Sequence, residues 1–284
     1  MTGVTIGPFA FPAALLVAFG AILLGTAVGN RVAAAKGVRV EPSLWLVVAT
    51  AVLAARAGFV ADYWASYAED PLSMLDIRDG GFTPVLGVAA ALVAGAWLAW
   101  RNRSERKALL AGVLAGSVAW IAGTAIVAWS PAGQKLPEVT LAELDGRALP
   151  LGALAGKPLV INLWASWCPP CRREMPALAE AQRAATDVTF VFVNQGESPD
   201  VIRAYLAAEG LSLKNVLLDP TGQLAQVTGS PGLPTTLFFD AKGTLVDRRF
   251  GELSRATLAQ RLEMLRPATP PGASGAAPVM KEKH

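Results

Sequence analysis

The chain has 284 residues with a formal net charge of +3, and this length allows two domains of ordinary size. The basic residues lie largely in short loops beside apolar runs instead of forming one basic face, which argues against a nucleic-acid-binding protein. Only two cysteines are present and the single histidine is the last residue, His284. Neither a framework of several disulfides nor a zinc site made of cysteine and histidine is therefore expected.

The composition of the chain changes at about residue 130. Before this point long uncharged runs of Ala, Val, Leu, Gly and Trp dominate, and after it apolar and charged residues mix as they do in soluble domains. We therefore predict a membrane α-helical bundle of four spans followed by an α/β domain. The predicted parts are a membrane domain at 1–130, a linker at 131–136, the soluble domain at 137–266 and a disordered tail at 267–284.

Each of the four apolar stretches is long enough to cross a hydrocarbon core, which needs about 17–25 helical residues. We place the spans at Phe9–Val28, Leu44–Val60, Pro84–Trp100 and Leu109–Trp129. No Lys or Arg precedes the first stretch, so it is expected to stay attached instead of being cleaved as a signal peptide. Tryptophans near the span ends suit the headgroup level or simply pack between helices, at Trp45, Trp97, Trp100 and Trp129.

Charge in the loops predicts the orientation of the bundle. Two of the loops are basic, through Arg31, Lys36, Arg39, Arg101, Arg103, Arg106 and Lys107. The loop at Ala61–Phe82 is acidic instead, with Asp62, Glu69, Asp70, Asp76 and Asp79 against the single basic residue Arg78. Because basic loops stay on the cytoplasmic side, both termini and the soluble domain are predicted to lie outside the cytoplasm, in the periplasm of a bacterium.

Arg56 is the one charge well inside an apolar run. A charge within a span suggests a functional role, but Arg56 lies about one turn from the outer end, where its side chain could also snorkel to the headgroups or serve the structure.

The stretch Ala55–Val60, then Asp70–Ile77 and Asp79-Gly80-Gly81, resembles part of the prolipoprotein diacylglyceryl transferase family over about the first 100 residues. In that family a His-Gly-Gly element used in lipid transfer follows the double glycine. Here the corresponding place reads Phe82-Thr83-Pro84-Val85-Leu86-Gly87, without histidine. We therefore expect an anchor with a groove for membrane lipid or a partner. A lipid transferase that carries a redox accessory domain is the alternative.

Strands and helices alternate in the soluble half, and their order indicates a mixed central sheet covered on both faces. Predicted strands are Val139–Leu144, Leu149–Leu151, Pro158–Trp164, Val188–Asn194, Val216–Leu218, Thr235–Asp240 and Gly243–Phe250. Predicted helices are Cys168–Ala185, Asp200–Gly210, Gly222–Val227 and Ser254–Leu265.

The two cysteines stand at the start of the first of these helices, in Cys168-Pro169-Pro170-Cys171. Free N–H groups and the positive end of the helix dipole favour a thiolate at Cys168, which is therefore the expected nucleophile. The spacing brings Cys171 within bridging distance, so that it can resolve a mixed disulfide. Pro169 and Pro170 cost little in a first helical turn.

The sequence from Gly156 to Pro176 reads Gly-Lys-Pro-Leu-Val-Ile-Asn-Leu-Trp-Ala-Ser-Trp-Cys-Pro-Pro-Cys-Arg-Arg-Glu-Met-Pro, and Gly232-Leu233-Pro234-Thr235-Thr236 follows downstream. These motifs resemble the thioredoxin superfamily, and within it the TlpA/ResA-like membrane-anchored thiol:disulfide oxidoreductases. The resemblance covers residues 137–266 and implies a thioredoxin-like fold.

The resemblance also implies roles for further residues. Pro234 matches the cis-proline beside the cysteine pair, and Trp167, Leu233 and Thr235 are expected to line the substrate groove. Asn162 stands where thioredoxin has a buried aspartate, and Glu174 matches a glutamate that ResA-like proteins place near the site. Glu174 is thus a candidate base for Cys171, with an ordinary surface glutamate as the alternative.

Three charged residues near the motif are left with open roles. Arg172 and Arg173 could favour an adjacent thiolate or be solvated surface charges. Glu197 could contact a partner or cap the following helix.

The predicted function is that of a thiol:disulfide oxidoreductase, a reductase of oxidised client proteins by resemblance, for example in cytochrome c maturation. The cysteine pair itself would carry the electrons, so no further cofactor and no metal is expected. No cysteine lies in a span, so a separate membrane donor of the DsbD or CcdA type is expected to reduce the pair. An oxidase or isomerase of the same fold and a non-catalytic docking protein are the alternatives.

Overall fold

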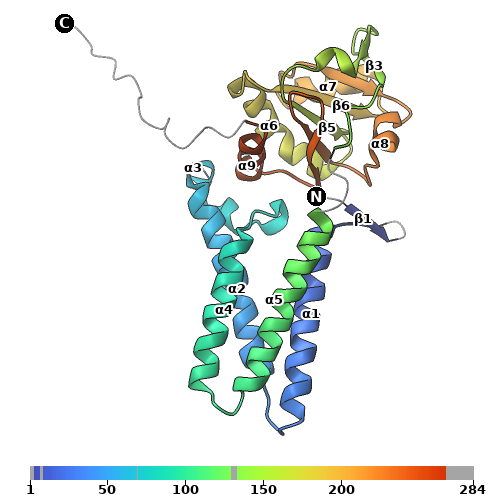
Figure 1. Cartoon of the computed structure of the whole chain (residues 1–284). Helices are drawn as coiled ribbons and strands as arrows, with labels where there is room; N and C mark the ends of the chain where they lie inside the picture. The colour runs from blue at the N-terminus through green and yellow to red at the C-terminus, as the bar shows by residue number, and fades with distance from the viewer. Residues whose placement is uncertain (1–2, 7–8, 69, 129–132, 267–284) are drawn as a thin grey trace, which may run out of the picture.

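The computed structural model describes residues 3–6, 9–68, 70–128 and 133–266. A bundle of long helices forms one part of the molecule, and an α/β unit lies at one end of it (Figure 1). The predicted disordered tail at 267–284, Glu69 and Trp129 lie outside the described residues.

Among the described residues, four helices are long and apolar enough to cross a membrane. They are α1 (Ala13–Ala34), α2 (Glu41–Asp62), α4 (Pro84–Arg101) and α5 (Arg106–Ala128). The predicted start of the first span is wrong, because Phe9–Pro12 forms strand β2, paired with β1 (Gly3–Ile6). Proline is tolerated at a helix start but not in a helix interior, and α1 begins directly after Pro12.

Helices α1 and α5 approach each other most closely at glycines. A Cβ atom added to Gly25 would lie 2.9 Å from the carbonyl oxygen of Gly112 and 3.2 Å from the Cα of Gly116. Small residues that let two backbones come together are the usual basis of helix pairing in membranes.

We therefore expect Gly25→Val to lower the thermal stability of the bundle in detergent. Overpacking of this kind costs about 1–3 kcal/mol, and circular dichroism of the helical signal would measure it. Gly20→Val on the same helix is the matched control, because a Cβ atom there meets nothing within 4 Å. Equal midpoints for the two variants would contradict the packing argument.

The loop between α2 and α4 is compact. It contains the short helix α3 (Trp64–Tyr67) and two 3-10 turns, η1 (Pro71–Leu75) and η2 (Ile77–Asp79). Arg56 is only 9% exposed, and its guanidinium donates to the carbonyl oxygens of Met74 and Gly81 and to the Asp79 carboxylate. Arg56 therefore does not snorkel: it has the structural role of fastening this loop to α2.

The mixed sheet that the sequence predicts is confirmed. Its strands are β3 (Thr140–Glu143), β4 (Ala148–Pro150), β5 (Leu159–Trp164), β6 (Thr189–Gln195), β7 (Val216–Asp219), β8 (Thr235–Phe239) and β9 (Leu245–Phe250). They lie in the order β4-β3-β7-β6-β5-β8-β9. The contacts of β6 with β5 and β7 are parallel, and the other pairs are antiparallel.

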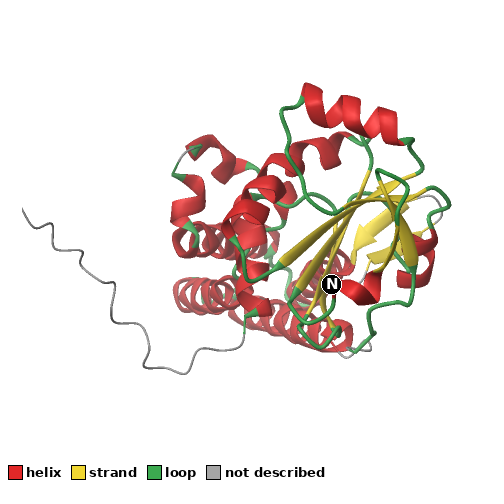
Figure 2. Ribbon diagram, turned by 90° about the horizontal axis from the view of Figure 1, so that it is seen from above, coloured by secondary structure: helices red, strands yellow, loops and turns green. Residues whose placement is uncertain are grey.

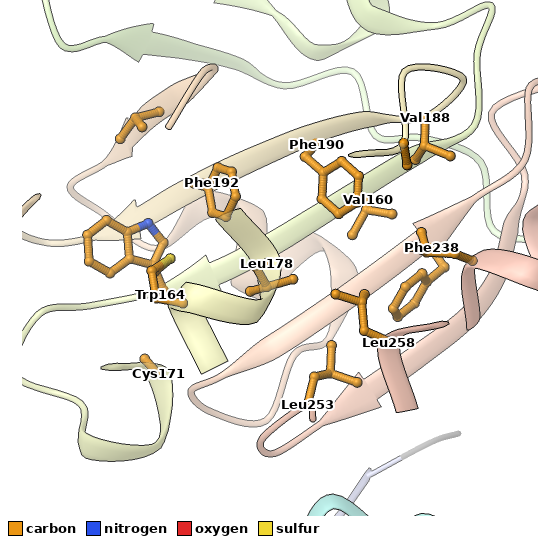
Figure 3. Packing of buried hydrophobic residues seen from close by; sticks show 14 of the residues in the cluster. Val160, Trp164, Cys171, Leu178, Val188, Phe190, Phe192, Phe238, Leu253 and Leu258 are labelled. Carbon is orange, nitrogen blue, oxygen red and sulfur yellow. The ribbon is translucent and has the colours of Figure 1, made fainter. Parts of the chain in front are cut away.

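Helices cover both faces of the sheet (Figure 2). Alternating residues of the fully buried β5 enter two separate cores, as the period of two in a strand requires. One core packs against α6 (Pro169–Ala184), α7 (Pro199–Ala208) and α9 (Arg255–Leu265). The other packs against the turn η3 (Leu151–Leu154) and α8 (Gln223–Thr228). Cys171 and Trp164 belong to the first core (Figure 3).

Candidate redox site

The two cysteines lie where the central strand β5 gives way to α6. Cys168 is the N-cap residue of α6, and its Sγ accepts a hydrogen bond from the Cys171 N–H over 3.3 Å. The two sulfur atoms form a disulfide with a Cα–Cα distance of 5.3 Å. After reduction, the same N–H and the helix dipole would stabilise a thiolate on Cys168.

Burial distinguishes the two sulfurs. Cys171 is fully buried, and Cys168 retains 3% of its surface. Cys168 is thus the more exposed residue of the pair, in the order that the sequence predicts. Trp167, immediately before it, is 66% exposed, so its ring is available to a client. Trp164 is fully buried in the core below.

Glu174 is the buried acid of the site. It lies three residues after Cys171 on α6, on the same side of the helix. Its carboxylate accepts hydrogen bonds from Asn162 Nδ2 over 2.7 Å and from the Leu253 N–H over 2.8 Å. Burial raises the pKa of the Glu174 carboxyl to about 8, and the two hydrogen bonds oppose that rise only in part. The surface-residue alternative is thereby wrong.

Asn162 anchors this acid from the middle of β5. Its amide nitrogen also donates to Thr236 Oγ1 over 3.0 Å. A neutral amide cannot take a proton from Cys171, but it can hold the Glu174 carboxyl in place. The buried titratable group of this site therefore lies on α6 and not on β5.

The peptide bond between Leu233 and Pro234 is cis. The Pro234 carbonyl accepts from the Gly251 N–H, so the turn before β8 is bonded to the end of β9. Leu233 is partly buried and packs against both cores. Thr235 differs from the prediction, because it is fully buried and its hydroxyl donates to the Gly232 carbonyl. It shapes the turn and does not line an open groove.

Glu197 is not the N-cap residue of the following helix, and it has a structural role that the sequence did not indicate. Its carboxylate accepts from the backbone N–H and the hydroxyl of Ser166 and from Asn194 Nδ2, whereas Ser198 is the N-cap residue of α7. Ser166 stands two residues before Cys168, so Glu197 ties down the loop that enters the site. The only signal in the sequence was its place after a strand end at the same edge of the sheet.

We expect Glu197→Ala to leave the Ser166 N–H without its acceptor and to lower the free energy of unfolding by about 1–3 kcal/mol. Urea titration with pulse proteolysis of the soluble half would measure this. Asp200→Ala is the control, because Asp200 pairs with Arg203 on the surface. An equally small effect of both substitutions would contradict the role assigned to Glu197.

The arginines after the motif are paired with acids. Arg172 Nη2 lies 2.7 Å from Glu209, and Arg173 Nη2 lies 2.6 Å from Glu252. Both are half-exposed surface pairs, which favours the alternative of surface charges over a direct role beside a thiolate.

A buried cysteine pair at a helix start, a cis-proline turn and a mixed sheet with helices on both faces define a protein of the thioredoxin superfamily. A family model described as Redoxin matches residues 131–262. The chain is 32% identical over 136 residues to thioredoxin-like protein YneN of Bacillus subtilis, which covers 46% of this chain and 79% of that protein.

Thiol-disulfide oxidoreductase ResA of Geobacillus thermodenitrificans is 30% identical over 137 residues, covering 48% of this chain and 78% of ResA. A solved structure of a thiol:disulfide interchange protein from Chlorobium tepidum is 26% identical and has a TM-score of 0.42. The match covers 48% of this chain and 98% of that structure. The chain belongs to the thioredoxin-like thiol:disulfide oxidoreductases, and it is an enzyme of that class.

Proposed function

We propose that this protein is a membrane-anchored reductase that passes two electrons from Cys168 and Cys171 to the disulfides of client proteins outside the cytoplasm. One observation carries the proposal: the nucleophile Cys168 stands at a helix start, and the buried acid Glu174 lies on the same helix. The pKa of Glu174 lies near that of a thiol. Clients such as the apocytochromes of cytochrome c maturation fit this chemistry.

The reaction begins when the Cys168 thiolate attacks one sulfur of the client disulfide. An S–S bond forms between Cys168 and the client, and the other client sulfur leaves as a thiolate that takes up a proton. Cys171 then gives its proton to the Glu174 carboxylate and attacks the Cys168 sulfur. The second client sulfur leaves and is protonated. The client disulfide is thus reduced to two thiols, and the pair is oxidised to its disulfide.

Location in the bacterial inner membrane is supported by the four apolar helices and by the charges at their ends. The two basic loops lie at the end of the bundle away from the thioredoxin-like domain (Figure 1). By the positive-inside rule this end is cytoplasmic, so the domain and both termini are periplasmic. The bundle is in contact with membrane lipid along its exposed apolar faces.

A separate donor must reduce the disulfide after each cycle. The chain has no cysteines besides Cys168 and Cys171, so a thiol relay across the bilayer cannot run through it. We propose a membrane protein of the DsbD or CcdA type as the dithiol donor, which becomes oxidised as the pair is reduced.

The redox state of the pair in spheroplasts tests this proposal. A membrane-impermeant thiol reagent is expected to label Cys168 while the donor is present, and labelling should fall when the donor is deleted. A pair that is oxidised at steady state despite the donor would indicate an oxidase or isomerase. Labelling that requires lysis of the cells would invert the topology and overturn the proposed location.

A further inference from the structure

The loop of residues 70–82, which we call the outer loop, is fixed to α2 by Arg56. Besides its bonds to Met74, Gly81 and Asp79, Arg56 Nη2 donates to the Asp76 carbonyl over 2.9 Å. A charged side chain that meets this many acceptors within one loop leaves the loop little freedom to move. The outer loop is therefore a rigid surface at the end of the bundle.

Asp79 divides its carboxylate between the two halves of the chain. Its Oδ1 accepts from Arg56 over 3.1 Å and from the Gly81 N–H over 2.9 Å, within the membrane half. Its Oδ2 accepts from the Ser254 hydroxyl over 2.8 Å, across the contact between the halves, and from the Tyr67 hydroxyl over 3.3 Å. Asp79 is 5% exposed. A buried carboxylate bonded in this way fixes the position of α9, of which Ser254 is the N-cap residue.

Further contacts close the same junction. Arg249 of β9 donates to the Asp79 carbonyl over 2.7 Å. A Cβ atom on Gly80, which has a φ of +66°, would lie 2.8 Å from the Arg249 guanidinium, so the loop approaches as only a glycine allows. Ala256 packs in one buried cluster with Phe59 and Tyr67. Figure 1 shows α9 beside the outer end of the bundle.

The segment of residues 252–254, which contacts Asp79 through Ser254, also binds Glu174, the buried acid of the redox site. Leu253, directly before Ser254, gives its N–H to Glu174. Glu252, one residue earlier, pairs with Arg173 of α6. The connection between β9 and α9 is thus bonded on one side to the active-site helix and on the other side to the membrane half. Figure 3 shows Leu253 and Cys171 in the same part of the core.

We propose that Asp79 is a positioning residue for thiol:disulfide exchange: through Ser254 it fixes the Leu253 N–H on Glu174 and keeps water away from that acid. The inference rests on the proposed function of Glu174. It also gives the residues that resemble a lipid transferase, Arg56 and Asp79-Gly80-Gly81, a different use in this chain, as the surface on which the redox domain is held.

Charged groups surround both Glu174 and Asp79, so a test must control for changes in the total charge near them. Glu174 faces Glu252 and Arg249 besides its two hydrogen-bond donors. Asp79 faces Arg249 and Arg261 of the soluble domain and Arg56 and Tyr67 of the membrane half. A substitution at the junction must therefore be compared with one that restores the total charge.

Ser254→Asp is the informative substitution, because aspartate is as good an N-cap as serine but its carboxylate would repel Asp79. In the full chain in lipid nanodiscs, with an oxidised peptide as substrate and dithiothreitol as reductant, the pH midpoint of the exchange rate should fall by about one unit. The midpoint falls because burial is the largest cause of the raised pKa of Glu174. Separation of the membrane half from the soluble half would let water reach Glu174 and lower that pKa. Ser254→Gly, which adds no charge, should lower the midpoint in the same direction by less.

The double variant Asp79→Asn with Ser254→Asp has the wild-type charge and a new amide-to-carboxylate hydrogen bond, so its midpoint should return to the wild-type value. Tyr63→Phe is the control, because it removes a different hydrogen bond between the halves, an exposed one of 3.0 Å to Glu263, which does not lead to Glu174.

An unchanged midpoint in Ser254→Asp and Ser254→Gly, or an equal fall in Tyr63→Phe, would overturn the inference while exchange by the wild type continued. Absence of exchange in the wild type, or a pH profile that does not respond to Glu174→Gln, would instead overturn the proposed function. The two failures are therefore distinguishable in one set of measurements.

Discussion

Replacement of Cys171 by alanine is expected to leave the protein joined to its client through Cys168. The chain has no cysteine besides these two, so no other thiol of the chain can attack the mixed disulfide once the Cys171 sulfur is removed. Turnover with an oxidised peptide should fall by roughly three orders of magnitude, as when one member of a nucleophilic pair is lost. Non-reducing electrophoresis and mass spectrometry of the adduct would detect the trapped client.

Cys168→Ser is the matched variant, because it removes the accessible sulfur and leaves the buried one in place. It should form no adduct, since a serine hydroxyl does not attack a disulfide at neutral pH and Cys171 cannot be reached from solvent. Adducts formed through Cys171 in this variant would reverse the order of the two sulfurs.

The sequence predicts the central part of the fold well because the local signals there agree. The nearly continuous apolar run of β5 fits a buried strand, and the Cys-Pro-Pro-Cys motif places a helix start after it. The observed bounds, Leu159–Trp164 and Pro169–Ala184, follow these signals closely. At the N-terminus the apolar pattern continues through Phe9–Pro12, and only the backbone restriction of Pro12 separates that strand from α1.

The sequence could not predict the partners of polar side chains that meet through tertiary contacts. Ser254 and Asp79 are 175 residues apart, and no periodicity relates them. Arg56 looked like a charge near a lipid surface because the loop that receives it has no regular pattern. The motif places Thr235 in the groove, but β8 is a strand buried on both faces, so Thr235 is buried as well.

Replacement of Glu174 by glutamine is expected to change both the pH dependence of stability and the rate of exchange. In the oxidised folded protein the pKa of Glu174 is raised to about 8 from an ordinary value of 4.5. The folded chain therefore retains a proton that the unfolded chain releases between these two pH values. The stabilisation is fully present below pH 4.5 and is lost as the pH rises through about 8.

Within that window the free energy of unfolding should fall with rising pH by up to about 1.4 kcal/mol per unit. Glu174→Gln keeps the volume and cannot ionise, so this slope should disappear from urea midpoints of the soluble half. Exchange at neutral pH should slow by about a hundredfold, because Cys171 loses the group that takes its proton. Glu180→Gln on the same helix is the control, since Glu180 pairs with Arg255 at the surface. A slope that persists in Glu174→Gln would show that another group titrates, and the proton would then need a different acceptor.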